Sequence, residues 1–220
     1  MKRAAAAFLF ALVSLGSAPG QEAAPGPAVD PLVLQRRLAM VLRQSTQHYE
    51  AGEYDTALER LGAIKGPAAE DLSVLNLRGA ILTKLGRYDQ ASESFRAILS
   101  AQPDFFPAAF NLGEVEFIRG DYAGALELFE DLRRREPRNE LVRFKILLCQ
   151  LLLGQDEEAQ KTARSLVPAG STPAWYYAQA MLARKAGDEA SARKHLDAAK
   201  AIYEAEGCKL FDESIAPVKF

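Results

Sequence analysis

Glycine, small and apolar positions recur along this chain with a period of 34 residues. Gly52, Gly86, Gly120 and Gly154 lie 34 residues apart, and Gly187 follows after 33. Five residues beyond each glycine is an alanine, and nine beyond it is an apolar residue. Seven residues before it is a mostly small one. The three columns read Ala57, Ala91, Ala125, Ala159, Ala192; Leu61, Phe95, Phe129, Ala163, Leu196; and Ser45, Gly79, Gly113, Leu147, Ala180. A period of this length indicates a repeat architecture.

Each column has a physical explanation, and together the columns predict a pair of helices. A glycine takes positive φ at a helix end and so separates two helices. Small residues let two helix backbones approach closely, and large apolar residues at helical spacing fill the space between helices. Pro103 and Pro137 end the second helix of their units. One unit is therefore a helix, a tight turn and an antiparallel helix, and such units stack because none buries its apolar face alone.

The pattern resembles the tetratricopeptide repeat family. The best match is residues 106–139, which carry Leu112-Gly113, Gly120-Asp121-Tyr122, Ala125, Phe129 and Pro137 in the order of that family. The resemblance covers residues 38–206, as units at about 38–71, 72–105, 106–139, 140–172 and 173–206. The departures are Asp156 and Glu189 in place of a tyrosine, Ala69 in place of a proline and Leu147 in place of a small residue.

This resemblance implies an all-α fold, a right-handed α-solenoid of about five helix-turn-helix repeats over residues 31–206. Its concave groove would be lined mainly by the first helix of each unit. Family members usually bind peptide segments or partner proteins there and usually have no catalytic residues. Because a fold does not determine a function, the function has to be inferred from the residues of the groove.

Helical spacing predicts which residues face the groove. Residues ten, six and three positions before each glycine share one helix face, and from the third unit onward that face is apolar and aromatic. We expect the partner-binding residues Phe110, Glu114, Phe117, Phe144, Leu148, Leu151, Tyr177 and Met181. Family members that grip a carboxylate gather cations and asparagines in the groove. Asn76, with Lys84 and Lys145 near the face, is too sparse a set, so a carboxylate clamp is rejected.

Two segments suggest that the chain covers part of this face itself. Residues 140–153 are apolar nearly all round, which is typical of a fully buried helix. Residues 207–220 contain Leu210, Phe211, Ile215, Val218 and Phe220, too many apolar side chains for a plain tail. This tail has three open readings: a cap on the last unit, a filling of the groove, or a segment that binds a partner.

The first residues predict export. Lys2 and Arg3 precede the apolar run Ala4–Val13 and the small residues around Ala18, the order of a secretory signal peptide over residues 1–20. Cleavage before Gln21 removes two cations and changes the formal charge from −2 to −4. Residues 21–30 are a linker rich in proline and alanine, and Asp30-Pro31 is a helix start. We expect a periplasmic or secreted protein with no membrane span after cleavage.

Composition and charge narrow the classes of partner and chemistry. The 220 residues are 49% hydrophobic and hold 27 Lys and Arg against 29 Asp and Glu, which argues against a nucleic-acid partner. His48 and His195 have no cysteine or histidine at metal spacing, and no phosphate loop or nucleophile motif occurs. We expect no metal, no cofactor and no enzymatic activity. The basic cluster Arg133–Arg135 with Arg138 fits a helix C-terminus, with an acidic partner as the alternative.

Cys149 and Cys208 leave a disulfide open, since export exposes them to an oxidising compartment. Such a bridge would need the tail to run back along the groove.

The favoured function is a non-enzymatic interaction module or scaffold of the cell envelope that binds a peptide or amphipathic segment in an apolar groove. Two alternatives are a carrier of an apolar small molecule or lipid, and a self-assembling structural spacer, in which case the chain would form a homo-oligomer. The sequence does not identify the partner.

Overall fold

A computed structural model describes residues 30–168 and 170–220 of the chain. Within them are eleven α-helices, one short 3-10 helix at Gly66–Glu70 and no strand, so the prediction of an all-α solenoid is confirmed. The first helices of the five pairs are α1 (Pro31–Glu50), α3 (Leu72–Lys84), α5 (Phe106–Arg119), α7 (Glu140–Leu152) and α9 (Ala174–Lys185). The second helices are α2 (Tyr54–Gly62), α4 (Tyr88–Ala101), α6 (Tyr122–Arg135), α8 (Asp156–Arg164) and α10 (Glu189–Ile202). A further helix, α11 (Ala205–Ile215), follows the last pair.

The recurring glycines form the turns inside the five pairs. All five have positive φ, between 72° and 85°, and they follow α1, α3, α5, α7 and α9. This is the left-handed region in which glycine carries no penalty for a Cβ atom. The chain can therefore reverse within a few residues, and the second helix packs back on the first.

The small-residue column allows the two helices of a pair to touch. A Cβ atom on Gly79 of α3 would lie 2.5 Å from the ring of Phe95 in α4, and one on Gly113 of α5 would lie 2.8 Å from the ring of Phe129 in α6. Both rings are fully buried. The glycine of the first helix and the aromatic ring of the second thus form one packing unit, which occurs in the second and third pairs.

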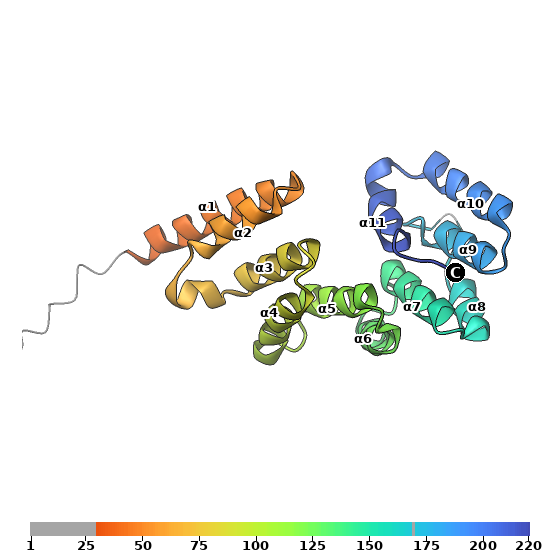
Figure 1. The fold of residues 1–220 in the computed structure, drawn as a ribbon, viewed down its shortest axis with the longest axis horizontal. Coiled ribbons are helices and arrows are strands. Elements are labelled where there is room, and N and C mark those ends of the chain that lie inside the picture. Colours follow the sequence, from red (N-terminus) through yellow and green to blue (C-terminus); the bar gives the residue numbers. More distant parts are fainter. Residues whose placement is uncertain (1–29, 169) are drawn as a thin grey trace, which may run out of the picture.

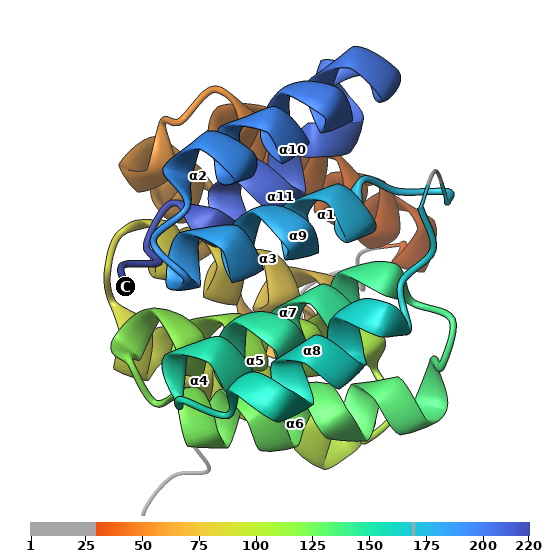
Figure 2. The same cartoon turned by 90° about the vertical axis from the view of Figure 1, so that its right-hand side faces the viewer.

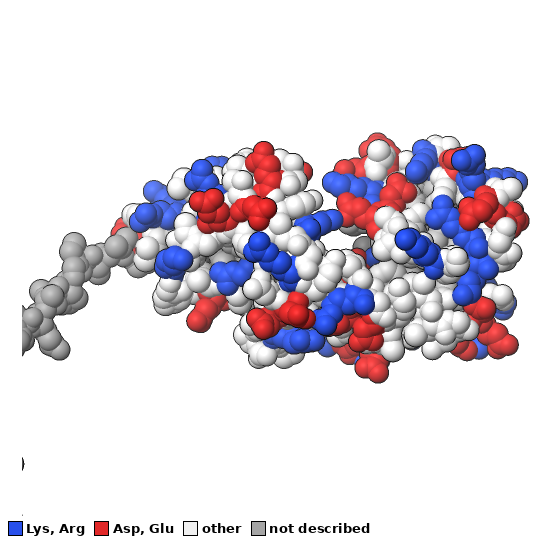
Figure 3. Space-filling view, viewed as in Figure 1, with Lys and Arg blue, Asp and Glu red and all other residues white. Residues whose placement is uncertain are grey.

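The helix pairs follow a curved path. In Figure 1 the chain runs from α1 and α2 down through α3 to α6 and then up through α7 to α10, so the first and last pairs stand on either side of a gap. The space-filling view shows the molecule hollowed between these two arms (Figure 3). The first helices form the inner, concave side, where α3 contacts α5 and α7 contacts α9.

The C-terminal tail lies on this inner side. The helix α11 is on the face of α9 and α10 that points toward α1 and α3 in both views (Figures 1 and 2). Its Phe211 and Ile215 belong to the same buried cluster as Phe144, Tyr177 and Met181 of the last two units. The tail thus fills part of the concave groove.

Residues 1–29 lie outside the described residues, and with them the predicted signal peptide and nearly all of the linker. The predicted helix start at their boundary is present. The carboxylate of Asp30 accepts a hydrogen bond from the amide of Leu32 at 2.9 Å, and α1 begins with Pro31. No helix in 30–168 or 170–220 has the length and apolar character to cross a bilayer.

Candidate partner-binding groove

The helix α7 forms the centre of the concave groove and has more buried residues than any other helix within 30–168 and 170–220. Every residue from Phe144 to Leu151 is buried, including Lys145 and Gln150. The apolar pattern of this segment therefore reflects contacts on all sides, from α6, α8 and α9, together with the contact of Phe144 with α11. The expectation of a fully buried helix here agrees with the structure.

The predicted binding residues fall into two groups. Five of them, all on α7 and α9, have no exposed surface: Phe144, Leu148, Leu151, Tyr177 and Met181. The other three lie on α5, where Phe117 is only 3% exposed and Phe110 and Glu114 are partly exposed. The expectation of an open apolar face over α7 and α9 therefore does not match this structure, because helical spacing shows which face points inward but not what covers it.

The cover over Phe144 and Tyr177 is the helix α11. The ring of Phe211 lies 5.2 Å from the ring of Phe144 and 5.3 Å from the ring of Tyr177, centroid to centroid. The hydroxyl of Tyr177 donates to the carboxylate of Asp212 at 2.7 Å. Burial, and then the hydrogen bond to this carboxylate, raise the pKa of the Tyr177 hydroxyl well above its usual range, so it stays a donor.

A second carboxylate of α11 reaches across the groove. Glu213 pairs with Lys84 of α3 at 3.1 Å, and Asp212 lies 3.7 Å from Lys200 of α10. These side chains are 38–55% exposed, so each pair contributes at most about 1 kcal/mol. Burial of Phe211 or Ile215 contributes roughly 1.5–3 kcal/mol each. The aromatic and apolar contacts therefore hold α11, and the charges orient it.

A cavity of about 660 Å³ remains between α11 and the first three units. We call it the notch. Its walls come from α1, α3, α5 and α7 on one side and from α11 with the residues after it on the other, and the lining includes Tyr49, Lys84, Phe110, Asn111, Glu114, Phe117, Ile118, Lys145, Leu210, Glu213 and Pro217. Ile118 is 41% exposed and Leu210 is 56% exposed. They are the two exposed large apolar side chains of the notch, and they lie on opposite walls.

A buried ion pair forms the floor of the notch. The ammonium of Lys145, 2% exposed, donates to Glu114 at 2.7 Å and lies 5.4 Å from the ring centroid of Phe117. The second carboxylate oxygen of Glu114 is buried without a hydrogen-bond partner. Glu114 therefore neutralises a cation of the neighbouring unit, which sequence reasoning did not foresee.

The three polar residues considered for a carboxylate clamp are all engaged. The side-chain amide of Asn111 donates to that of Asn76 at 3.2 Å, while Lys84 and Lys145 pair with Glu213 and Glu114. The charges of the two lysines are therefore already compensated within the chain. This arrangement agrees with the rejection of a clamp.

Tyr49, Ile118 and Leu210 were not among the predicted partner-binding residues, and Leu210 was named only as an apolar residue of the tail. Tyr49 was on the predicted face but outside the selected set, because the choice favoured the apolar last units. Ile118 lies one residue beyond Phe117 and off the predicted face. The one signal for an amphipathic helix in the tail was the helical spacing of Phe211 and Ile215, with the acidic residues Asp212 and Glu213 between them.

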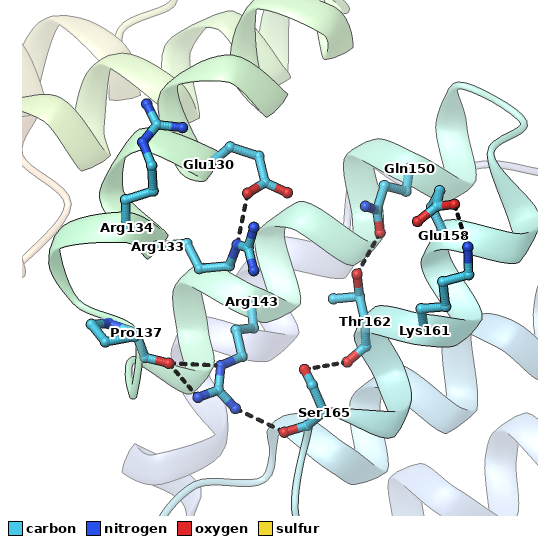
Figure 4. Close-up of a pocket in the computed structure, with 10 residues that line it drawn as sticks. All are labelled: Glu130, Arg133, Arg134, Pro137, Arg143, Gln150, Glu158, Lys161, Thr162 and Ser165. Carbon is cyan, nitrogen blue, oxygen red and sulfur yellow. Dashed lines mark hydrogen bonds and ion pairs between the residues drawn. The ribbon is translucent and has the colours of Figure 1, made fainter.

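A second cavity, on the outer side of α6, α7 and α8, holds part of the basic cluster. Figure 4 shows three of its four cations, Arg133, Arg143 and Lys161, already engaged. Arg133 pairs with Glu130 and Lys161 with Glu158, each at 2.7 Å, and Arg143 donates to the carbonyl oxygens of Pro137 and Ser165. Arg134 pairs with Asp131 at 2.8 Å. These contacts favour the structural reading of the cluster.

The cysteines and histidines have structural surroundings. Cys149 and Cys208 are both free and buried, and burial raises the pKa of the Cys149 thiol to about 12. His48 contacts Glu53 at 2.5 Å, and His195 packs edge-on against Trp175. In the part of the chain that the structure describes, no three His, Cys, Asp or Glu residues are grouped as metal ligands would be.

Comparisons with known proteins identify the repeat. Two family models, each described as tetratricopeptide repeat, match residues 76–140 and 116–182. A curated relative, Protein CTR9 homolog of Arabidopsis thaliana, is 33% identical over 85 residues. That match covers 38% of this chain and 8% of the relative, so the chain spans a small fraction of the relative's length.

Solved structures agree on the fold. A tetratricopeptide repeat protein from Parabacteroides merdae is similar with a TM-score of 0.65 and 18% identity, over 80% of this chain and 70% of that one. The protein TTC0263 of Thermus thermophilus is similar with a TM-score of 0.63 and 21% identity, over 81% of this chain and 98% of that one. The protein MamA of AMB-1 is similar with a TM-score of 0.54 and 24% identity, over 76% of this chain and 99% of that one. Identities this low speak for the architecture alone.

Proposed function

Because this chain is a tetratricopeptide repeat protein, we propose that it is a non-enzymatic scaffold that binds a segment of another protein in the notch. Repeat solenoids of this kind present extended concave surfaces to partners. The bound segment is a peptide or an amphipathic helix, since the walls of the notch combine apolar and charged side chains.

One observation supports this proposal above the others. Ile118 and Leu210 expose large apolar side chains toward the same cavity from opposite walls. Phe110 and Tyr49 supply aromatic surface beside them, and aromatic residues in concave sites are the usual anchors of protein interfaces. A partner side chain entering the notch would bury apolar surface on both walls at once.

The proposal places this scaffold in the cell envelope or outside the cell. Its support is the sequence of residues 1–20, with the order of charged, apolar and small residues of a secretory signal. The partner is then another exported protein or the exposed part of a membrane protein.

The experiment is photo-crosslinking in cells from a probe at position 118, with a probe at position 167 as the matched control. Val167 is an exposed apolar residue, 56% exposed, and does not line the notch. We expect a crosslinked band at the mass of a second protein from position 118 and none from position 167. Equal bands from both positions, or only internal crosslinks from position 118, would contradict the proposal.

A second candidate function is a carrier of an apolar small molecule. A cavity of about 660 Å³ is the favouring observation, since ligand pockets usually measure roughly 300–1,000 Å³. Native mass spectrometry of protein purified without detergent tests it. A bound mass that delipidation removes would favour the carrier, and a bare chain would favour the scaffold.

A further inference from the structure

The helix α11 is additional to the repeat and lies where the groove would hold a ligand. The five helix pairs end with α10, and α11 follows after the short connection at Tyr203 and Glu204. It packs across the concave side as well as against α10, because its Phe211 contacts both α7 and α9 and its Asp212 lies 3.7 Å from Lys200 of α10. The helix α11 thus occupies the place that a bound helical ligand would take in the groove, and it is part of the same chain.

The seat of α11 has a defined order of features. Phe144 and Tyr177 form an aromatic slot around Phe211, and the hydroxyl of Tyr177 donates to the carboxylate of the next residue, Asp212. On the far side of the groove, Lys84 pairs with the carboxylate of Glu213. Ile215, one helical turn after Phe211, packs into the same buried apolar cluster as Phe211.

We propose that the face of α7 and α9 recognises an amphipathic helix in which a phenylalanine is followed directly by two carboxylates, and that α11 occupies this seat in competition with such a partner helix. This inference goes beyond the proposed function, because it concerns the seat beneath α11 rather than the notch, and it names the chemistry of the partner at that seat. Charge complementarity supports it: the cations around the seat are Lys84 and Lys200, and both face carboxylates of α11.

The contacts of α11 are suited to exchange. Its buried face consists of Cys208, Phe211, Ser214 and Ile215, while Asp212, Glu213 and Leu210 keep large exposed fractions. Its first turn has no side-chain cap, since Glu204 makes no capping hydrogen bond. A partner helix with the same order of side chains can replace these contacts one for one.

The test uses the full chain and a synthetic peptide of residues 204–217 carrying Cys208→Ser. Maleimide alkylation of Cys208, read by mass spectrometry, reports the opening of α11, because Cys208 lies on the buried face of this helix and is only 2% exposed. Cys149 is the internal reference, being buried in α7 with a pKa of about 12. Saturating peptide is expected to raise the alkylation rate of Cys208 at least tenfold and to leave Cys149 unchanged.

The matched control peptide carries Asp212→Lys and Glu213→Lys and keeps the phenylalanine. We expect it to leave the rate at its peptide-free value. If this control accelerates Cys208 as much as the acidic peptide does, recognition of the two carboxylates is wrong.

Two chain variants weaken the internal competitor to different extents. Phe211→Ala removes the aromatic contact, and Asp212→Ala removes a partly exposed carboxylate together with the acceptor of the Tyr177 hydroxyl, while the apolar face of α11 stays intact. Anisotropy of the labelled acidic peptide should show its affinity at least tenfold higher for Phe211→Ala than for the parent chain, with Asp212→Ala between them. If Phe211→Ala makes Cys149 reactive, that variant is unfolded and only Asp212→Ala is used for the comparison. A higher affinity of the peptide for Asp212→Ala than for the parent chain then supports the inference, and an equal or lower affinity contradicts it.

The inference is overturned if the acidic peptide neither accelerates alkylation of Cys208 in the parent chain nor binds a folded variant more tightly. That outcome leaves the proposed function standing if the crosslink from position 118 is found, since Phe144 and Tyr177, the aromatic slot of the seat, do not line the notch. Loss of the position-118 crosslink with an intact peptide response would instead contradict the proposed function.

Discussion

At the scale of single residues, the close contact of a glycine with an aromatic ring fixes how near two helices of a pair can come. Gly79 has no side chain to hold Phe95 away, and the ring fills the space where a Cβ atom would be, at 2.5 Å. The sequence foretold this column of small residues because it repeats. It could not foretell which ring each glycine meets at what distance.

The variant Gly79→Ala should destabilise the chain by about 1–3 kcal/mol, because overpacking forces the buried Phe95 ring or the helices to shift. Gly62→Ala is the matched control, at the end of α2 with nothing within 4 Å of the added atom. It should be neutral or stabilising by up to about 1 kcal/mol through helix propensity. Urea unfolding followed by far-UV circular dichroism measures both, and equal midpoints for the two variants would contradict this packing account.

At the scale of helices, the pairing of α5 with α7 depends on a charge that the apolar pattern hides. Lys145 interrupts an apolar run and is nevertheless almost wholly buried, with Glu114 of α5 as its partner. Spacing correctly placed Glu114 on the inward face. It gave no information on the lysine that would meet it, since the two lie 31 positions apart.

The two partners of this pair should differ in their effect on stability. Glu114→Ala leaves a fully buried ammonium unpaired and should cost about 3–5 kcal/mol of unfolding free energy. Lys145→Met fills the same volume with an apolar chain and leaves a carboxylate that is 25% exposed, so its cost should be smaller. Thermal unfolding of both variants measures the difference, and a larger loss for Lys145→Met would show that the ammonium is not the buried charge that matters.

The position of the tail is the feature of the helix arrangement that the sequence did not predict. Repeat periodicity predicted the five pairs because each position is supported by several copies of the same column. The residues of α11 have no second copy, so three readings stayed open until Phe211 was seen between Phe144 and Tyr177. This contact covers two of the predicted binding residues on α7 and α9, namely Phe144 and Tyr177.

At the scale of the whole molecule, the curve of the solenoid brings distant segments together. Lys84 of α3 and Glu213 of α11 are 129 positions apart and make an ion pair across the groove. The notch exists because the first and last arms face each other (Figure 3). A local period cannot supply this closure, because small rotations between successive pairs accumulate over the whole chain.

The prediction of export also belongs to the whole chain. Expressed in a cell with a secretory system, the chain should be recovered outside the cytoplasm with Gln21 as its first residue, since a small residue precedes that position. Intact-mass measurement and N-terminal sequencing of the recovered protein check both points. A chain that keeps Met1 and fractionates with the cytoplasm would contradict the signal-peptide reading.

The central claim, that the notch is the surface which binds a partner protein, is tested most directly by affinity measurements on the partner crosslinked from position 118. Calorimetry would compare Ile118→Glu, Leu210→Glu and the off-notch control Val167→Glu, all at exposed apolar positions. The account predicts at least a tenfold loss of affinity for the first two variants and none for the control. Unchanged affinity in Ile118→Glu and Leu210→Glu, or an equal loss in Val167→Glu, would contradict it.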